Sequence, residues 1–474
     1  MLIRSASGLR GIAKDHFTPE LIDKYISAFI TTQNIKSCII GRDGRPSGKK
    51  ISQWVIESFH KNGINVENCG LATTPTMQIM TEKDNYDGGI VITASHNPSE
   101  YNGLKFLQTD GTFLSPEQCE DLFKAVDQNV SIDTPDSLGL VSDYSTANEE
   151  HIDKVLATKC IDTDNIRKKK FKVVVDCVNG AGSFILPMLC EQLGCEVITM
   201  NCNGDGNFTR IPEPLAENLD ALEEKVLEVG ADIGFATDPD GDRLSIVSNK
   251  GRAIGEEYTL LFAVMNFFLL ISKYDDRKGK VSFGELGEKR QEWNFPFNYG
   301  VVTNLSTSKM IDDFLAIYAI KSNRTRIGEA HVVKEMKKQN IWIGGEGNGG
   351  VILKEVHLGR DSLVAVAMIL NLLSIKSLSV SDIISEPIIN LHHIPSYIFA
   401  KDKIKIDDRI DFDSLESIFD CDEINKVDGI KFSWKDKWIH IRKSNTEPII
   451  RIFAEAPTKD TVDELVNTLK NHLK

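Results

Sequence analysis

Four short segments of the sequence place polar or charged side chains directly after an apolar stretch. They are 93–98 (TASHNP), 238–243 (DPDGDR), 344–350 (GGEGNGG) and 442–448 (RKSNTEP). Ligands of α/β proteins bind just beyond the carboxyl ends of the sheet strands, so side chains in these places are candidates for chemistry.

The first segment offers a hydroxyl group. The apolar run 88–93 predicts a strand that ends just before Ser95. The Asn97-Pro98 pair that follows prevents a regular continuation of the strand, so Ser95 should lie in a turn. A hydroxyl there can act as a nucleophile or carry a phosphate, with His96 or Lys105 nearby for proton transfer or charge stabilisation. The alternative interpretation is a serine that caps a helix or stabilises an ordinary turn.

The second segment holds three carboxylates at alternate positions. Asp238, Asp240 and Asp242 can converge on a turn, and like charges held so close favour a hard divalent cation such as Mg²⁺. An EF-hand loop is excluded, because its sixth and twelfth positions would be Arg243 and Asn249 instead of Gly and Glu. The alternative is a solvated acidic turn, since Asp-Gly is a common turn sequence.

In the third segment, glycines leave Glu346 and Asn348 as the only side chains of the loop. A carboxylate acceptor beside an amide suits paired sugar hydroxyls. Neither glycine-rich phosphate-binding fingerprint is present, so the segment does not resemble a nucleotide loop. A flexible turn is the alternative.

The fourth segment combines hydroxyl, amide and guanidinium groups that could hold an anion. Its candidate residues are Arg442, Ser444, Asn445 and Thr446, with Arg451 a little further along the chain. A polar turn with a salt-bridging arginine is the alternative. Two weaker segments, 7–11 (SGLRG) and 41–48 (GRDGRPSG), also place arginines among glycines. On their own they indicate little more than turns.

Elements that alternate between strand and helix must position these residues. We expect strands at 37–40, 88–93, 172–176, 195–200 and 232–236, and helices at 51–62, 183–194 and 221–229. This alternation is typical of parallel sheets covered by helices. The pattern starts again near residues 160 and 256, and the last part differs, with short strands at 429–432, 438–442 and 449–454 and a helix at 461–473. We therefore predict three α/β domains, 1–156, 157–255 and 256–385, and a smaller α+β domain, 386–474.

The charge balance limits the classes of partner. The chain of 474 residues carries 55 Lys and Arg against 69 Asp and Glu, a formal net charge of −14. Such a surface repels polyanions, which argues against nucleic-acid binding. A few arginines and lysines focused in one place can still bind a small anionic substrate.

The cysteines and the apolar segments indicate a cytoplasmic protein without a membrane segment. The nine cysteines form no CxxC pair, which argues against a disulfide framework or a structural zinc site. The first residues lack the apolar stretch of a signal peptide. The most apolar segment, 258–271, is too short to span a bilayer, so we expect a buried helix. The sequence indicates no oligomeric state.

Together, in this order and spacing, the four segments resemble the α-D-phosphohexomutase family from Ser7 to Ala456. That family includes phosphoglucomutases, phosphomannomutases and phosphoglucosamine mutases. The resemblance implies four domains around a central cleft, the first three with a shared mixed α/β fold and the fourth smaller. It further implies that a hexose 6-phosphate and a hexose 1-phosphate are interconverted through a phosphoserine and a hexose 1,6-bisphosphate.

The resemblance also assigns roles to residues. Ser95 is the phosphorylated residue, and its phosphate lies on Mg²⁺ held by Asp238, Asp240 and Asp242. Lys105 matches the position for proton transfer or charge stabilisation, and His96 adjoins Ser95. The remaining matches are the arginines of the cleft, the sugar-binding pair and the phosphate pocket: Arg10, Arg243, Glu346, Asn348, Arg442, Ser444, Asn445, Thr446 and Arg451.

The sequence departs from parts of the family in the sugar loop. Many bacterial relatives carry Ser and then His there, whereas this chain has Asn348 and Gly350, so the general acid and base are not identified. Asn445 stands where several relatives have Gly. The GEGNGG form favours glucosamine phosphates, with broad phosphoglucomutase and phosphomannomutase activity as the alternative. A phosphoserine-type phosphatase and a non-catalytic sugar-phosphate sensor are the remoter alternatives.

Overall fold

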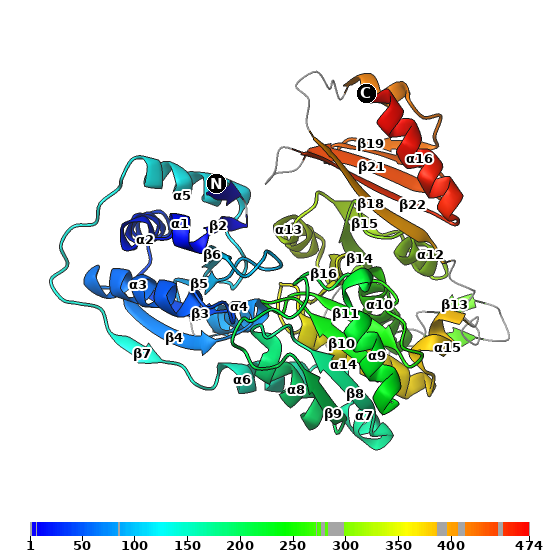
Figure 1. The fold of residues 1–474 in the computed structure, drawn as a ribbon, viewed down its shortest axis with the longest axis horizontal. Coiled ribbons are helices and arrows are strands. Elements are labelled where there is room, and N and C mark those ends of the chain that lie inside the picture. The colour runs from blue at the N-terminus through cyan, green and yellow to red at the C-terminus, as the bar shows by residue number, and fades with distance from the viewer. Residues whose placement is uncertain are drawn as a thin grey trace. The chain divides into compact units, whose positions relative to one another are not determined.

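The computed structural model forms two compact units (Figure 1). The first unit contains Met1–Asn266 and Asn348–Ile384, and the second contains Phe267–Gly347 and Ser385–Lys474. The structure describes residues 2–5, 7–83, 86–271, 273–275, 280–282, 298–385, 396–405, 413–443 and 449–473.

The first unit begins with a seven-stranded sheet in the order β1-β2-β6-β5-β3-β4-β7. Its strands are β1 (Ile3–Ser5), β2 (Gly8–Ile12), β3 (Ser37–Arg42), β4 (Asn65–Leu71), β5 (Gly88–Ile92), β6 (Tyr101–Gln108) and β7 (Val141–Asp143). Strand β3 is parallel to β4 and to β5, and β4 is parallel to β7. The sheet is mixed, because β6 runs antiparallel to both β5 and β2.

Helices cover both faces of this sheet. The helices of residues 13–169 are α1 (Ala13–His16), α2 (Pro19–Gln33), α3 (Gly48–Lys61), α4 (Thr74–Lys83), α5 (Pro116–Asp127), α6 (Ala147–Leu156) and α7 (Thr163–Lys169). Of these, α6 packs on α4, and α7 packs on a later helix of the same unit. Buried side chains of α2, α3 and α5 share one apolar core with Ile40, Ile90 and Leu104. Helix α4 covers the other face, where it approaches so closely that a Cβ on Gly41 would lie 2.4 Å from the Met77 sulfur.

A second sheet follows in the same unit, in the order β11-β10-β8-β9. Its strands are β8 (Lys172–Asp176), β9 (Glu196–Met200), β10 (Ile233–Thr237) and β11 (Leu244–Ser248). Strands β8, β9 and β10 are parallel, and β11 returns antiparallel to β10 after a short loop. The helices of this part are α8 (Gly182–Gln192) and α9 (Asp220–Val229), with the 3₁₀ turn η1 (Ala216–Asn218) before α9.

The rest of the first unit comes from two stretches of the chain. Helix α10 (Glu257–Ile271) starts there and continues into the second unit. Strand β17 (Gly350–Leu353) is followed by α14 (Ser362–Lys376) and α15 (Val380–Ser385). Asp361 caps α14, because its Oδ1 accepts the backbone N–H groups of Leu363 and Val364.

The second unit contains a parallel sheet and an antiparallel sheet. In the first of these, β14 (Asn298–Asn304) lies between β15 (Asn323–Thr325) and β16 (Ile341–Glu346), and both neighbours are parallel to it. Helices α12 (Met310–Ala316) and α13 (Glu329–Gln339) connect these strands. A hairpin of β12 (Lys273–Asp275) and β13 (Lys280–Ser282) also belongs to this unit.

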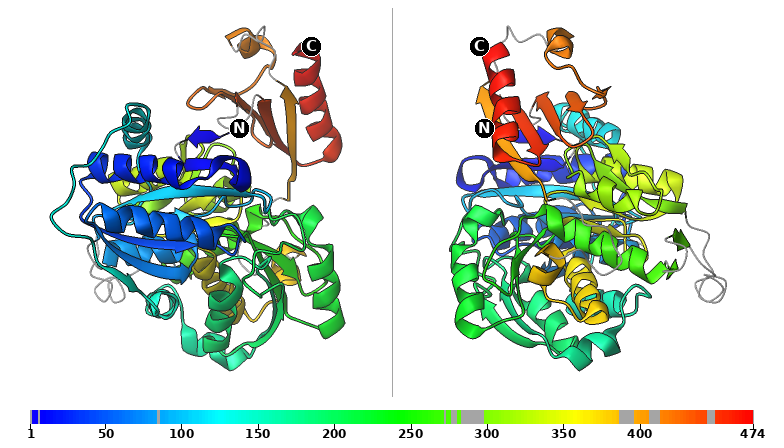
Figure 2. Two further views of the ribbon diagram at one scale, coloured as in Figure 1. Left: turned by 60° about the vertical axis from the view of Figure 1, so that its left-hand side comes forward. Right: turned by 90° about the vertical axis from the view of Figure 1, so that its right-hand side faces the viewer.

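The last sheet has five strands in the order β18-β22-β21-β20-β19. They are β18 (Ile398–Lys405), β19 (Glu423–Asn425), β20 (Ile430–Ser433), β21 (Trp438–Lys443) and β22 (Ile449–Ala456), all antiparallel to their neighbours. The 3₁₀ turn η2 (Asp413–Ser417) precedes β19. Helix α16 (Lys459–His472) lies against one face of this sheet, as Figures 1 and 2 show. Its apolar side chains share a core with those of the strands. Edge strand β18 exposes three lysines, Lys401, Lys403 and Lys405.

The expected strands and helices are confirmed to within a few residues at their ends. The segment 258–271 is a helix whose described side chains are largely buried, and none of the described helices is long and apolar enough to cross a membrane. One expectation needs correction, because Glu346 is the last residue of β16 and not a loop residue. Lys105 lies within strand β6.

Candidate active site

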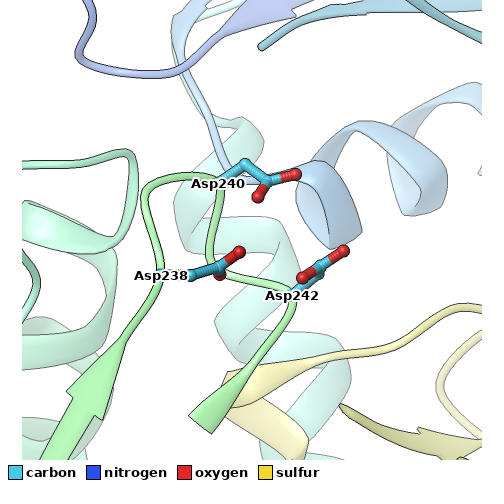
Figure 3. A group of neighbouring side chains, drawn as sticks. All are labelled: Asp238, Asp240 and Asp242. Atoms are coloured by element: carbon cyan, nitrogen blue, oxygen red, sulfur yellow. The ribbon is translucent and has the colours of Figure 1, made fainter. Parts of the chain in front are cut away.

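Three buried aspartates lie on the loop that joins β10 to β11 (Figure 3). Asp238, Asp240 and Asp242 have no solvent-exposed surface, and one carboxylate oxygen of each lies within 4.8 Å of the others. A glycine is needed at the tip of this loop. Gly241 has a φ of +69°, and a Cβ there would lie 2.8 Å from the Thr73 methyl carbon.

The three carboxylates do not share one electrostatic environment. Burial and the two neighbouring carboxylates raise the pKa of Asp238 well above its usual value. Burial opposes ionisation of Asp240 as well, but Lys105 lowers the pKa of Asp240, with its Nζ 2.6 Å from Oδ2. Thr74 at the start of α4 donates to the same oxygen at 2.6 Å. Asp242 Oδ2 pairs with Arg360 Nη2 at 2.6 Å.

These contacts leave two carboxylate oxygens without a hydrogen-bond partner among the described residues. Both are buried: Oδ1 of Asp240 and Oδ1 of Asp242. Arg243 Nε lies 3.8 Å from Asp242 Oδ1, which is too long for a hydrogen bond. Buried acceptors almost always have a hydrogen-bond partner, so two that lack one beside a third carboxylate fit a hard divalent cation. The donor set, three carboxylates and a serine hydroxyl, is all oxygen, as Mg²⁺ prefers.

Ser95 follows β5 and points at the aspartates. Its hydroxyl donates to Asp238 Oδ2 at 3.1 Å, and its backbone N–H donates to Thr93 Oγ1 at 2.9 Å. The residue is buried, and its backbone is left-handed, with a φ of +50°. That conformation costs a residue with a side chain about 1–2 kcal/mol. The ring nitrogen Nδ1 of His96 lies 3.4 Å from Ser95 Oγ.

Lys105 reaches the aspartates because of strand alternation in β6. Its neighbours Leu104 and Phe106 point into the apolar core under α2, α3 and α5. Side chains of a strand alternate between faces, so Lys105 points to the opposite face, where α4 lies. Its side chain is buried there against Asp240, with Asp242 Oδ2 at 3.7 Å.

Two arginines that the family resemblance implicates lie close to these groups. Arg10 of β2 donates to the Asn97 side chain at 3.2 Å, and burial lowers its pKa. Arg243 is the last residue of the loop between β10 and β11, the aspartate loop (residues 238–243), and its backbone N–H donates to Asp238 Oδ1 at 3.3 Å. Its guanidinium pairs with Glu213 at 2.9 Å, and this partner raises the pKa of Arg243 although burial opposes the shift.

Sequence reasoning missed several residues that hold the aspartate loop in place. Thr74 donates to Asp240, Arg360 pairs with Asp242, and Ser362 Oγ donates to the Gly241 carbonyl at 2.7 Å. No local pattern marks Arg360, because it lies more than 100 residues along the chain from the aspartates. The only local signal near Arg360 is Asp361, a residue type that often caps a helix. Asp361 caps α14, and the start of α14 lies beside that loop.

The sugar-binding candidates fall in different units. In the second unit Glu346 is buried, and its Oε1 accepts from the Asn304 side chain at 2.8 Å and from the Gly328 N–H at 2.9 Å. Asn348 is half-buried and belongs to the first unit. At Gly350 a Cβ would lie 2.2 Å from Arg360 Cδ, so the arginine fills the space of any side chain there.

The phosphate-binding candidates are described in part. Arg442 on β21 and Arg451 on β22 are directly paired across the two antiparallel strands, so they lie side by side. Arg442 is buried, and its Nε is 3.3 Å from Asp428 Oδ1. Ser444, Asn445 and Thr446 lie outside the described residues.

The fold and this cluster define a class of protein: a multidomain α/β enzyme with an acidic, oxygen-rich centre beside a serine hydroxyl. Family models of phosphoglucomutase/phosphomannomutase match nearly the whole chain. Their alpha/beta/alpha domains I, II and III match residues 1–132, 149–251 and 285–389, and their C-terminal domain matches 403–472. The chain belongs to the phosphoglucomutase/phosphomannomutase family. It is a four-domain hexose-phosphate mutase, an isomerase that acts by intramolecular phosphoryl transfer.

Relatives match along almost their full length. A "Probable phosphoglucosamine mutase" of Methanopyrus kandleri is 31% identical, covering 97% of this chain and 95% of the relative. A "Phosphoglucomutase/phosphomannomutase" of Thermococcus kodakarensis is 34% identical, covering 96% and 95%. Among solved structures, a phosphoglucomutase/phosphomannomutase family protein of Burkholderia thailandensis shares the fold, with a TM-score of 0.78 at 22% identity over 99% of this chain and 96% of that one.

Proposed function

We propose that this chain interconverts hexose 6-phosphate and hexose 1-phosphate through a phosphorylated Ser95, with glucosamine phosphates as the preferred substrates. One observation carries the role of Ser95: its hydroxyl, buried and fixed in orientation, donates to Asp238 within the aspartate cluster. A nucleophile held by a carboxylate beside a cation site is the arrangement that phosphoryl transfer requires.

The proposed reaction exchanges one phosphorus–oxygen bond for another. Phosphoserine gives its phosphoryl group to a free hydroxyl of the sugar monophosphate, whose proton moves to the Ser95 oxygen as the bond to that oxygen breaks. The product is a hexose 1,6-bisphosphate. Its other phosphoryl group then returns to Ser95, with the proton moving the opposite way, and the isomeric monophosphate leaves.

Charged side chains of this chain support both half-reactions. Lys105 and Arg10 are placed to balance negative charge near the Ser95 loop, and Arg243 does so beside Asp238. His96 has the ring nitrogen nearest to Ser95 Oγ among the contacts described, so we assign it as a candidate proton carrier. Lys105 is the alternative carrier.

We assign Asp238, Asp240, Asp242 and the Ser95 oxygen as the ligands of Mg²⁺. When bound, Mg²⁺ supplies positive charge that stabilises the transferring phosphoryl group. The buried Oδ1 atoms of Asp240 and Asp242, which have no hydrogen bond among the described residues, support this assignment. A solved Aspergillus fumigatus N-acetylphosphoglucosamine mutase is described as a complex with GlcNAc-6P and magnesium, and its TM-score of 0.54 at 14% identity supports a shared fold.

The remaining candidates are assigned to the substrate. Glu346 and Asn348 would bind hydroxyls of the sugar ring, which both orientations of the bisphosphate present. Arg442 and Arg451, with Ser444, Asn445 and Thr446, would bind the phosphate that does not react. The adjacent placement of the two arginines on β21 and β22 supports a forked contact with one phosphate.

The choice of sugar rests on the relatives. Several that cover nearly the whole chain are named phosphoglucosamine mutase, at 30–32% identity. The relative from Thermococcus kodakarensis, at 34%, favours the second candidate, a mutase of broad glucose and mannose specificity. We also infer domain boundaries at 156, 255 and 385, and a cytoplasmic location in which all nine cysteines stay reduced, as they are in the structure.

A coupled assay with three substrates tests the proposal. Glucosamine, glucose and mannose phosphates are compared by kcat/KM, and the intact mass of the protein is followed during turnover. We expect glucosamine 6-phosphate to give the highest kcat/KM, and wild-type protein to gain one phosphate that Ser95→Ala does not gain. Normal turnover by Ser95→Ala would refute the phosphoserine role, and so would steady release of inorganic phosphate, which indicates a phosphatase.

A further inference from the structure

Arg45 lies beneath the Ser95 loop, in the glycine-rich segment 41–48 between β3 and α3. Its side chain is fully buried. The guanidinium donates to four backbone carbonyls of that loop. They belong to Ser95 at 2.5 Å, Asn97 at 2.6 Å, Tyr101 at 3.0 Å and Pro98. One side chain therefore ties together the whole turn from the candidate nucleophile to the start of β6.

A buried carboxylate fixes the arginine in turn. Asp43 Oδ2 lies 2.9 Å from Arg45 Nε, and Asp43 Oδ1 accepts the Arg45 N–H at 3.0 Å. Thr93 also donates to Asp43 Oδ2, at 2.6 Å, and Thr93 Oγ1 accepts the Ser95 N–H. The Ser95 peptide groups are thus held from both sides, through Thr93 at the N–H and through Arg45 at the carbonyl.

Neighbouring loops of the same unit cover this arrangement. The Phe208 ring lies 5.0 Å from the Arg45 guanidinium carbon. Gly44 and Gly206 approach so closely that a Cβ on Gly206 would lie 2.3 Å from the Gly44 carbonyl oxygen. The Arg45 guanidinium itself is fully buried, so its N–H donors face the loop carbonyls and Asp43 and not solvent.

The left-handed backbone of Ser95 explains what this network is for. A residue with a side chain keeps a φ of +50° only where the surrounding structure imposes it. We propose that Arg45, fixed by Asp43, is a positioning residue that imposes this conformation and so aims Ser95 Oγ at the aspartate cluster. The inference rests on the proposed role of Ser95 as phosphoryl carrier. It assigns the segment 41–48 a part in the reaction.

The chemistry requires an arginine. A guanidinium presents five N–H donors in one plane, and Arg45 uses them on four carbonyls and one carboxylate. A lysine ammonium has three donors around a point and cannot span the same set. Arg45→Lys therefore keeps the positive charge opposite Asp43 and loses most of the hydrogen bonds to the loop carbonyls.

Two variants test the proposal. Arg45→Met alone would leave Asp43 buried and unpaired, so the double variant Asp43→Asn with Arg45→Met, which removes both charges together, is the one we expect to fold. Arg45→Lys is the second variant. The rate of Ser95 phosphorylation by a hexose 1,6-bisphosphate is measured in a single turnover by intact mass. Mn²⁺ binding without substrate is measured by electron paramagnetic resonance, and folding is measured by thermal unfolding.

We expect the phosphorylation rate to fall about 100-fold in both variants, because a small displacement of a reacting atom has that effect. The dissociation constant of Mn²⁺ and the KM of the sugar phosphate should change less than about three-fold. A folded variant with a rate within about ten-fold of wild type would overturn the proposal. A loss that lies entirely in KM or in metal affinity would overturn it as well.

A matched control uses another arginine that donates hydrogen bonds to backbone carbonyls of a loop. Arg324 in the second unit donates to the carbonyls of Thr307 and Ser308 and pairs with Asp312 at 2.5 Å. Arg324→Met with Asp312→Asn removes the same groups far along the chain, and we expect Ser95 to be phosphorylated at the wild-type rate. An equal loss in this control would overturn the specific role of Arg45. Phosphorylation of Ser95→Ala would instead refute the proposed function, which keeps the two failures distinct.

Discussion

The two units of the molecule hold their candidate residues in different ways. In the first unit the charged groups contact one another. Lys105 pairs with Asp240, Arg360 pairs with Asp242, and Ser95 donates to Asp238. In the second unit they contact supporting structure instead. Glu346 accepts from an amide and a backbone N–H, and Arg442 pairs with Asp428, which also accepts the Ile327 N–H.

This difference indicates a division of labour. A reacting centre must be rigid before the substrate arrives, and mutual ion pairs among buried groups provide that rigidity. Groups that only bind hydroxyls or a phosphate can be held by supporting backbone and side chains. Substitutions in the Ser95 and aspartate cluster of the first unit should therefore reduce kcat, and substitutions of Glu346 or Arg442 in the second unit should raise KM.

Asp240→Asn should give the largest effect. The variant loses a proposed metal ligand and the partner of buried Lys105, so we expect kcat to fall about 1,000-fold and the Mg²⁺ midpoint to rise about 100-fold. Asp220→Asn, which removes the same charge from an exposed helix start, is the control and should change neither. A metal titration that matches wild type would remove Asp240 from the metal site.

Acid should destabilise the second unit through His440. Burial lowers the pKa of His440 to about 4, against 6.5 for the unperturbed side chain. The unfolded chain therefore binds the proton first, so this contribution to stability is intact above pH 6.5 and declines as the pH falls toward 4. The expected loss is about 3 kcal/mol.

The fluorescence of Trp438, two residues away in the same strand, can follow this acid transition, and His440→Gln should flatten it. An identical acid profile in wild type and variant would show that His440 does not control the second unit's acid stability.

Arg442→Gln tests whether a residue of the second unit affects KM and not the rate of phosphoryl transfer. Loss of a charged hydrogen bond to the substrate phosphate costs about 2 kcal/mol, so KM should rise about 30-fold. Because the residue lies in the second unit, the single-turnover rate of Ser95 phosphorylation at saturating bisphosphate should stay within about two-fold of wild type. A fall in that rate with KM unchanged would contradict the division between the units.

Gly350→Ala should give the smallest effect, and it tests the packing of Arg360. The added methyl group would overlap the Arg360 side chain, which must move, and the strain should cost about 1–2 kcal/mol in the free energy of unfolding. Arg360→Ala in the same chain makes room, so the two substitutions together should cost less than their sum. Additive losses would show that the two side chains do not compete for this space.

Local patterns in the sequence predicted much of this structure. The run 172–176 is a strand with those limits, and the spacing of Asp238, Asp240 and Asp242 places their oxygens together on a turn. Both depend on residues adjacent in the chain, where alternation and turn chemistry decide the outcome. The family resemblance from the four segments was confirmed along nearly the whole chain.

Contacts between distant segments could not be predicted in the same way. Arg45 reads as one more residue of a turn, and its role depends on where β5 and β6 place the carbonyls of residues 95–101. Arg360 reaches Asp242 only because the start of α14 packs beside the aspartate loop. No local pattern contains the left-handed φ of Ser95, since serine elsewhere prefers the extended or helical regions.

The lysines of β18 have a consequence for how two folded molecules of this protein meet. An edge strand with free backbone groups can pair with the same strand of another molecule, which begins aggregation. Lys401, Lys403 and Lys405 place three like charges along that edge, so two copies brought together there would repel each other. The C-terminal sheet therefore carries a safeguard against self-association that is independent of catalysis and weakens as the salt concentration rises.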